Sequence, residues 1–369
     1  MALTLPPGVT PYYQEESIAI VHGDCRDVLP MLAAGSIDAI LTDPPFFGVL
    51  EDHWDNAWTS RTTFLEWVRG FFDEWLRVLR FNGSLFMFAY PSMAAHIEVL
   101  ISKRFNVLNH IVWNKTNGGS ASRNDKSALR SFIPLSERII FAEHYGADNR
   151  AKGEAGYLAK CDELRGFVFE PLRKYLADEF SALGWNAEDL NRICGTASMA
   201  GRHFTARSQW CLPTADHYAK LQAAANGHLR REYEDLRREY EDLRREYEDL
   251  RRPFAITSCD KYSDVWQFNT SSGEGTFHPA QKPVALMAHI IHASTRDGAT
   301  LLDPFMGSGT TLLVAKNLRR CAIGIEISQQ YCDITIKRLQ QEVLPLEVLE
   351  PQASTHVQAS LSLEEPSHA

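Results

Sequence analysis

Short apolar runs alternate with amphipathic segments through the first part of the chain. Residues 18–21 and 37–41 are mostly apolar and have the length that is typical of buried strands. Between residues 62 and 79, large apolar side chains recur every three or four positions, which predicts one helix. Further helices are expected at 28–32 and 93–103, a turn at 82–83, and further strands at 84–89, 107–113 and 137–142. Strands that alternate with helices predict a doubly wound, mostly parallel α/β sheet.

The last third of the chain predicts a site for a nucleoside-bearing cofactor. A short apolar strand at 299–303 is followed by a glycine loop at 304–309 and a helix from 310 to 318. Glycines let a ligand approach the backbone closely, and an acid roughly 20 residues further on can reach ribose hydroxyls, which is the place of Glu326. The loop lacks the Gly-Lys-Ser/Thr ending of a P-loop and the G-x-G-x-x-G pattern. A nucleoside cofactor without a pyrophosphate therefore fits better than a nucleotide.

The tetrapeptide Asp43-Pro44-Pro45-Phe46 follows the expected strand at 37–41. Two prolines hold this segment extended and leave its carbonyl groups rigidly oriented. A carboxylate and a carbonyl together can accept both hydrogens of one amino group, and an aromatic ring can stack on a nucleobase. The plain alternative is a strand that ends in a proline turn with a core phenylalanine.

Together, these segments resemble the S-adenosylmethionine-dependent amino-DNA methyltransferases. Residues 43–46 are similar to the catalytic motif of that family, and Asp-Pro-Phe-Met-Gly-Ser-Gly-Thr-Thr at 303–311 is similar to its cofactor loop. The order of the two motifs resembles the permuted β class. Residues 22–25 resemble the turn whose acid meets the cofactor adenine, 111–115 a strand that helps to wall the base pocket, and 278–283 the segment before the first cofactor helix.

The resemblance implies a mechanism. The target base is flipped out of the duplex, Asp43 and the Pro44 carbonyl accept the two amino hydrogens, Phe46 stacks on the base and Trp113 closes the pocket. The methyl group then moves directly from S-adenosylmethionine to the nitrogen, without a covalent enzyme intermediate. The cofactor contacts that the resemblance implies are Asp24, Cys25, His278, Lys282, Asp303, Phe305, Gly307, Ser308, Gly309, Thr310 and Glu326.

The identity of the methylated base depends on one residue. In the family, aspartate at the position of Asp43 is typical of enzymes that act on adenine N6, and serine is typical of those that act on cytosine N4. Adenine in double-stranded DNA is therefore the expected target, and cytosine N4 is the alternative. Two other classes stay open at this point, namely an RNA or protein-glutamine methyltransferase and a binding protein that has kept the fold without catalysis.

The segment from 146 to 258 has a different pattern and is interpreted as a target-recognition insertion. Helices are expected at 170–183 and 187–194, Gly184 separates them, and a third helix is expected to begin at 199–204. A helix, a turn and a second helix in succession are typical of DNA-reading domains. The plain alternative is a small group of three packed helices that does not contact DNA. The DNA-binding candidates are Trp113, Lys115, Arg123, Lys126, Arg130, Ser198, Arg202, His203 and Arg207.

Within the insertion, the heptad Arg-Arg-Glu-Tyr-Glu-Asp-Leu occurs three times in succession from Arg230 to Leu250. Its tyrosines and leucines alternate at intervals of three and four, which puts them in one stripe of a helical arm spanning 228–252. The main interpretation is a solvated arm stabilised by Glu/Arg pairs four residues apart. Self-association and packing against the recognition helices are the alternatives. The repeat is a whole number of codons, so copy number can change without a frameshift.

Composition sets limits on these interpretations. The net charge is −9, which argues against a uniformly basic DNA-binding surface and leaves a local basic groove as the expectation. The seven cysteines form no C-x-x-C pair, so no metal site is expected. Neither a signal sequence nor a membrane-spanning run is evident, so a cytoplasmic location without membrane contact is expected. The expected partners are double-stranded DNA and a second copy of the chain in a homodimer.

The expected domain organisation follows from these segments. The methyltransferase domain is divided in the sequence by the insertion, so that its catalytic and cofactor halves meet only in the folded protein. The expected order is an N-terminal tail at 1–16, the catalytic half at 17–145, the insertion at 146–258, the cofactor-binding half at 259–341 and a disordered acidic tail at 342–369.

Overall fold

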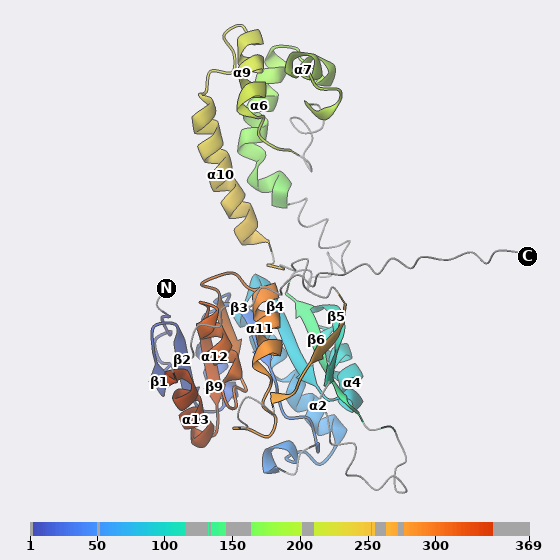
Figure 1. Cartoon of the computed structure of the whole chain (residues 1–369), viewed down its shortest axis with the longest axis vertical. Coiled ribbons are helices and arrows are strands. Elements are labelled where there is room, and N and C mark those ends of the chain that lie inside the picture. Colours follow the sequence, from blue (N-terminus) through green and yellow to red (C-terminus); the bar gives the residue numbers. More distant parts are fainter. Residues whose placement is uncertain are drawn as a thin grey trace, which may run out of the picture.

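One large sheet forms the centre of the main body in the computed structural model, which describes residues 3–49, 52–115, 132, 134–144, 164–200, 210–251, 253–254, 263–271 and 277–341. Nine strands are found in these residues, in the spatial order β1-β2-β9-β8-β3-β4-β6-β5-β7 (Figure 1). Their bounds are β1 (Tyr13–Gln14), β2 (Ile18–His22), β3 (Ile37–Thr42), β4 (Leu79–Ala89), β5 (Asn106–Lys115), β6 (Ser136–Glu143), β7 (Val265–Phe268), β8 (Thr300–Asp303) and β9 (Cys321–Glu326).

The predicted doubly wound, mostly parallel sheet is confirmed. Strands β2, β9, β8, β3 and β4 run parallel as neighbours, and β6 is antiparallel to both β4 and β5. Helices cover both faces, so side chains of one strand enter two different cores: Ile37 and Ile40 of β3 enter one, Ala39 and Leu41 the other. This double coverage explains why the strand sequences are continuously apolar.

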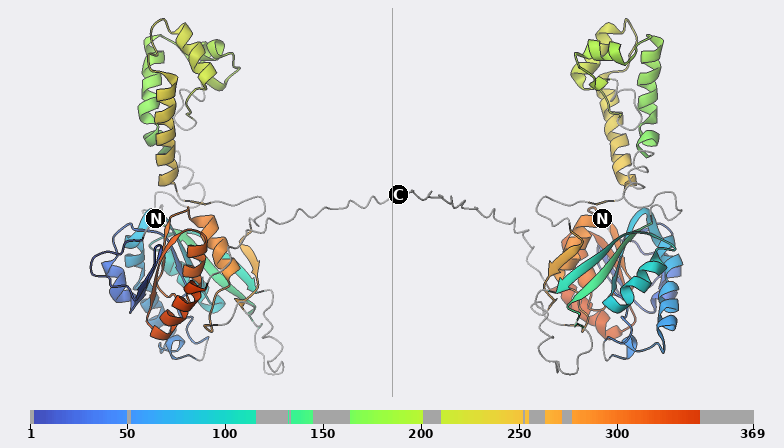
Figure 2. Two further views of the ribbon diagram at one scale, coloured as in Figure 1. Left: turned by 60° about the vertical axis from the view of Figure 1, so that its left-hand side comes forward. Right: turned by 90° about the vertical axis from the view of Figure 1, so that its right-hand side faces the viewer.

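The helices that cover the sheet form two layers (Figures 1 and 2). Buried side chains of α1, α2, α3 and α4 share the core that contains Ile40, and those of α11, α12 and α13 share the core that contains Leu41. The bounds of these helices are α1 (Cys25–Val28), α2 (Arg61–Arg69), α3 (Phe72–Val78), α4 (Pro91–Ile101), α11 (Val284–Ser294), α12 (Thr310–Asn317) and α13 (Gln329–Gln340).

Three local expectations are wrong. The single helix expected at 62–79 is two helices, because α2 ends at Gly70, whose N–H is bonded back to Glu66 and Trp67. The turn expected at 82–83 lies inside β4, where Gly83 is needed because a Cβ atom there would be 2.6 Å from the Leu79 side chain. The helix expected at 28–32 is instead α1 followed by the short 3₁₀ turn η1 (Leu29–Met31), which contains a proline at its start.

A separate group of helices projects from the sheet (Figures 1 and 2). It consists of α6 (Glu170–Ala182), α7 (Ala187–Cys194), α9 (Ala215–Ala224) and α10 (Tyr233–Leu250). We call α6, α7 and α9 the helical unit, and α10 connects it to the sheet. The helical unit has its own hydrophobic core, which includes Leu172, Leu176 and Trp210. Helices α6 and α7 match the helices expected from the sequence, whereas most of the third, expected at 199–204, lies outside the described residues.

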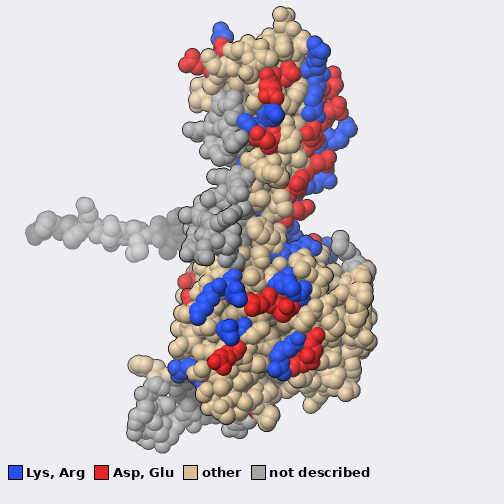
Figure 3. All heavy atoms as spheres, turned by 180° about the vertical axis from the view of Figure 1, so that it is seen from behind, with Lys and Arg blue, Asp and Glu red and all other residues tan. Residues whose placement is uncertain are grey.

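The repeat helix α10 packs against the helical unit, which is the third of the interpretations given above. Leu236 is fully buried, and the ring of Tyr240 lies 5.3 Å from that of Phe169. The opposite side of α10 is solvated and carries alternating charges (Figure 3). The described ion pairs between two residues of α10 join residues three apart rather than the expected four, as in Arg245 with Asp242.

We expect Leu236→Ala to destabilise the helical unit by about 2–5 kcal/mol, because it removes a fully buried side chain. Leu250→Ala is the matched control, since it changes the same heptad position where the side chain is 36% exposed. The measurement is denaturant unfolding of the full chain. An equal loss of stability in both variants would contradict the packing of α10 described here.

Candidate functional site

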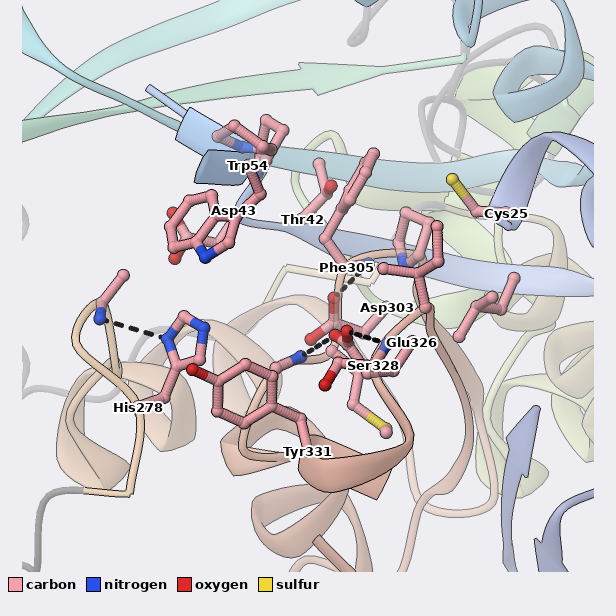
Figure 4. A pocket seen from close by; sticks show the side chains of 18 of the residues that line it. Cys25, Thr42, Asp43, Trp54, His278, Asp303, Phe305, Glu326, Ser328 and Tyr331 are labelled. Atoms are coloured by element: carbon pink, nitrogen blue, oxygen red, sulfur yellow. Dashed lines mark hydrogen bonds between the residues drawn. The ribbon is translucent and has the colours of Figure 1, made fainter. Parts of the chain in front are cut away.

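Acidic side chains meet at the carboxyl ends of the parallel strands. Asp303 and Glu326 are the last residues of β8 and β9, Asp43 directly follows β3, and Asp24 caps α1 just after β2. Open α/β sheets bind their ligands at this edge. A cavity of about 410 Å³ lies there, and Figure 4 shows Asp43, Asp303 and Glu326 among its lining side chains.

The cavity brings together most of the catalytic and cofactor residues predicted from the sequence. Gly309 is the exception, because it lies behind the cavity wall with a φ of +74°, and a Cβ atom there would be 2.2 Å from Thr335. Only glycine fits this position, at which α12 begins. The predicted residues that line the cavity are Asp24, Cys25, Asp43, Pro44, Pro45, Phe46, His278, Lys282, Asp303, Phe305, Gly307, Ser308, Thr310 and Glu326.

Buried Asp303 and half-buried Glu326 hold the glycine loop in place. Glu326 accepts the N–H of Gly307 at 2.9 Å and that of Ser328 at 2.8 Å. Asp303 accepts the hydroxyl of Thr311 at 2.5 Å, and burial raises the pKa of Asp303 to about 7. Burial also raises the pKa of Glu326, although the backbone N–H groups oppose this effect. The loop is therefore preorganised at the end of β8.

Aromatic rings and one neutral histidine line the same side of the cavity. The His278 ring lies 5.7 Å from the Trp54 ring and 4.4 Å from the Tyr331 ring. Burial, reinforced by the charge of Lys282, lowers the pKa of His278 to about 4, so the imidazole is neutral near pH 7. Flat apolar surfaces beside carboxylates suit a ligand that combines an aromatic base with hydroxyl groups.

Asp43 belongs to a chain of buried charges. The ammonium of Lys282 lies 2.5 Å from Oδ2 of Asp43 and 3.4 Å from Oε2 of Glu137, and Lys115 lies 2.5 Å from Oε1 of Glu137. Burial by itself lowers the pKa of Lys282, but the two carboxylates outweigh burial and the pKa is raised. Glu137, between two cations, has a lowered pKa even though burial opposes this. Two acids thus balance two lysines.

The second oxygen of Asp43 is available as an acceptor. Oδ1 is buried and has no hydrogen-bond partner within the described residues. Burial raises the pKa of Asp43 to about 6, and the neighbouring Lys282 limits that rise. A buried acceptor without a partner is costly unless a ligand satisfies it. The geometry therefore fixes one carboxylate oxygen and leaves the other for a donor in the cavity.

Lys282 and Trp113 differ in position from the sequence-based expectation. Lys282, expected among the cofactor contacts, lines the cavity, and its ammonium donates to Oδ2 of Asp43. Trp113 does not line the cavity. Its side chain is buried in the core, where the indole N–H donates to the carbonyl of Phe268 at 3.0 Å. Strand β7 pairs with β5 at this point and covers the ring.

Sequence reasoning missed Asp55, which organises the catalytic loop. This fully buried acid accepts the N–H groups of Phe46 at 2.5 Å, Phe47 at 3.0 Å and Val49 at 2.6 Å. It thereby stabilises a turn in which Phe47 has a φ of +71°. The one available signal was an acid among tryptophans at 52–58, and nothing in that spacing identifies its partners.

The predicted DNA contacts are only partly described. Lys115 is paired with Glu137, and Ser198 is exposed after α7 in the helical unit. The other candidates lie outside the described residues, namely Arg123, Lys126, Arg130, Arg202, His203 and Arg207.

Within the described part of the chain, no group of three or more histidine, cysteine, aspartate or glutamate side chains could hold a metal ion. None of the helices in the same residues has both the length and the apolar character needed to cross a membrane.

Comparison with known proteins identifies the family. The model of a DNA methylase family, N6_N4_Mtase, matches residues 37–337. The type II methyltransferase M.ScaI of Streptomyces caespitosus is 25% identical over 91% of this chain and 86% of its own length. The type II methyltransferase M2.LlaDCHI of Lactococcus lactis subsp. cremoris is 24% identical over 89% and 91% of the two chains.

The fold also has a counterpart among solved structures. The PvuII DNA methyltransferase (cytosine-N4-specific) superposes with a TM-score of 0.52 at 13% identity, and the match covers 91% of each chain. With the family match to residues 37–337, the resemblance of the two sequence motifs is confirmed. The chain belongs to the N6/N4 DNA methylase family, whose methyl donor is S-adenosylmethionine.

Proposed function

We propose that this DNA amino-methyltransferase methylates the exocyclic N6 of adenine at a specific sequence in double-stranded DNA. The observation that carries the proposal is the unpartnered buried Oδ1 of Asp43, which lines the same cavity as the glycine loop. An amino group is the donor that this acceptor lacks, and the neighbouring loop would hold the methyl donor.

The residues present suit S-adenosylmethionine. Glu326 and Asp24 can receive hydroxyl or amine donors, because a carboxylate oxygen accepts more than one hydrogen bond. The rings of Trp54, Phe305 and Tyr331 line the cavity beside them. When bound there, the cofactor supplies a methyl group activated by its positive sulfur.

The protein contributes orientation and charge. Asp43 accepts one amino hydrogen at Oδ1, the Pro44 carbonyl accepts the other, and Phe46 packs against the flipped base. Both hydrogen bonds draw the nitrogen lone pair out of conjugation with the ring, so that it can form the new N–C bond. One amino proton must leave as that bond forms, and ionised Asp43 is the base within reach.

Adenine N6 is preferred to cytosine N4 on the identity of Asp43 alone. Both bases present an amino group, and the geometry of an acceptor pair suits either of them. The alternative of cytosine N4 therefore stays open. The family match to a DNA methylase argues against RNA or protein glutamine as the substrate.

The helical unit is proposed as the target-recognition domain. It projects from the body on α10 and carries exposed Ser198, one of the DNA-binding candidates (Figure 1). Positive and negative side chains are interspersed on the body face shown in Figure 3, which is in keeping with a local rather than a general basic surface. The homodimer stays a prediction. It gains no support from α10, whose apolar stripe packs within the same chain.

The test of the proposed function is methyl transfer from labelled S-adenosylmethionine to DNA, followed by nucleoside analysis. We expect N6-methyladenine. N4-methylcytosine would support the alternative. Transfer of the labelled methyl group to RNA or protein but not to DNA would overturn the proposal.

We expect Asp43→Ala to reduce methyl transfer by about 10²- to 10⁴-fold, because the amino group loses its base and its orienting acceptor. Affinity for S-adenosylmethionine should stay within about threefold, since Asp43 acts on the target base.

Glu326→Ala should show the opposite pattern and weaken cofactor binding by about tenfold or more, because it removes charged hydrogen bonds. Calorimetric binding and single-turnover rates separate the two effects. Similar defects in both variants would contradict the assigned roles.

We expect the transfer rate to fall as the pH drops through about 6, because protonated Asp43 can no longer accept the amino hydrogen. Lys282→Met removes the cation that limits the pKa of Asp43, so the acidic limb of the pH–rate profile should move to higher pH. Lys115→Met is the control and should move it less, because Lys115 pairs with Glu137. An unmoved limb in Lys282→Met would contradict the role of the ion pair.

A further inference from the structure

The C-terminal end of α10 is fixed to the catalytic body. The Asn82 amide, on β4, donates to the carbonyl oxygens of Asp249 at 2.7 Å and Arg251 at 3.1 Å. The guanidinium of Arg296, just after α11, donates to the carbonyls of Glu248, Asp249 and Arg251. The last carbonyls of a helix lack partners within the helix, so these two side chains act as a C-terminal cap supplied by the body. We call this contact the lower joint.

The N-terminal end of α10 is fixed to the helical unit. The Tyr218 hydroxyl, on α9, donates to the carbonyl of Arg231 at 2.9 Å, and the Gln222 amide donates to the carbonyl of Leu229 at 2.8 Å. The N–H of Leu229 donates to Glu179 on α6 at 2.9 Å. We call this contact the upper joint. Helix α10 therefore connects two anchored ends.

Between the joints, the packing surface of α10 repeats itself. A shift of seven residues replaces each tyrosine by a tyrosine and each leucine by a leucine, because the three heptads are identical. The ring of Phe169, the residue just before α6, already contacts two equivalent positions, with ring centroids 5.3 Å from Tyr240 and 5.7 Å from Tyr247. The side chains on this repeated surface therefore do not distinguish one register of α10 against α6 from a register seven residues away. The two joints select the register that is observed.

The length of α10 then depends on the number of heptads. One heptad adds about 10.5 Å to a helix at about 1.5 Å per residue. Seven residues of helix turn by about 20° less than two full turns. One added heptad therefore leaves the orientation of the helical unit relative to the body nearly unchanged. The displacement equals about three base pairs of duplex DNA, at about 3.4 Å each.

We propose that α10 is a molecular spacer whose number of heptads sets the distance between the recognition helices and the base pocket. Repeat number thereby determines which positions around the target base are read. This inference rests on the proposed function, because it takes the helical unit to be the part that reads DNA.

The experiment compares the natural chain with variants that carry two or four heptads, made by deleting or duplicating residues 237–243. Each is assayed for thermal unfolding, for S-adenosylmethionine affinity, and for the methylated sequences in a randomised DNA library. We expect both variants to fold, to bind the cofactor within about threefold of the natural chain and to methylate the same base. Their flanking sequence preference should move by about three base pairs, with the rate on the natural site lowered by about tenfold or more.

Two further variants test the physical basis. Duplicating only residues 241–243 rotates the helix by about 300°, so it breaks the apolar stripe, and we expect lower thermal stability than for the whole-heptad insertion. Asn82→Ala combined with Arg296→Ala frees the lower joint at unchanged length and should broaden the sequence preference while the chain stays folded.

The outcomes separate the spacer from the proposed function. If the natural chain leaves the library unmethylated, the proposed function fails. If it methylates DNA and the two- and four-heptad variants methylate the same sequences at the same rate, only the spacer is overturned. Whole-heptad variants that fail to fold would also overturn it, because the repeated seam would then have a unique register.

Discussion

The ion pair between Asp43 and Lys282 is the constraint on which the site depends. It joins residues 239 positions apart, in the two halves of the catalytic body, and the lysine is only 6% exposed. A buried cation is stable only where carboxylates surround it, and here Asp43 and Glu137 both do so. The pair limits the rise in the pKa of Asp43 that burial causes, and it leaves the other carboxylate oxygen of Asp43 without a partner at the cavity. The same ion pair therefore balances the buried charges and fixes the acid that we propose to be catalytic.

The sheet makes this arrangement possible. Strand β3 lies between β8 and β4, so the loop that begins at Asp43 and the glycine loop leave the same edge from adjacent strands, although the insertion separates them in the sequence. Asp55 and Glu326 then hold the two loops by accepting backbone N–H groups. Burying such an acid costs little free energy, because the backbone N–H groups replace the hydrogen bonds that the carboxylate loses to water. The cavity is thus preorganised before any ligand enters.

The helical unit follows a different physical logic. Its core is separate from the two cores of the sheet, and α10 joins it to the body through capped helix carbonyls rather than a shared apolar interface. The negative overall charge, −9, agrees with a protein in which DNA contacts are confined to part of the surface. The side chains of the helical unit can therefore change without disturbing the cores of the sheet, because the cores are separate.

Local patterns determined the fold class, the motif at 43–46, the glycine loop at 304–309 and the helical repeat, because periodicity and rigid residues act over a few positions. Long-range contacts decided the rest. The partner of Lys282, the burial of Trp113 and the role of Asp55 depend on strands and loops that meet only in the folded sheet. The sequence likewise left three placements of the repeat open. Packing of the apolar stripe of α10 against aromatic side chains such as Phe169 and Trp210 shows which of the three placements occurs.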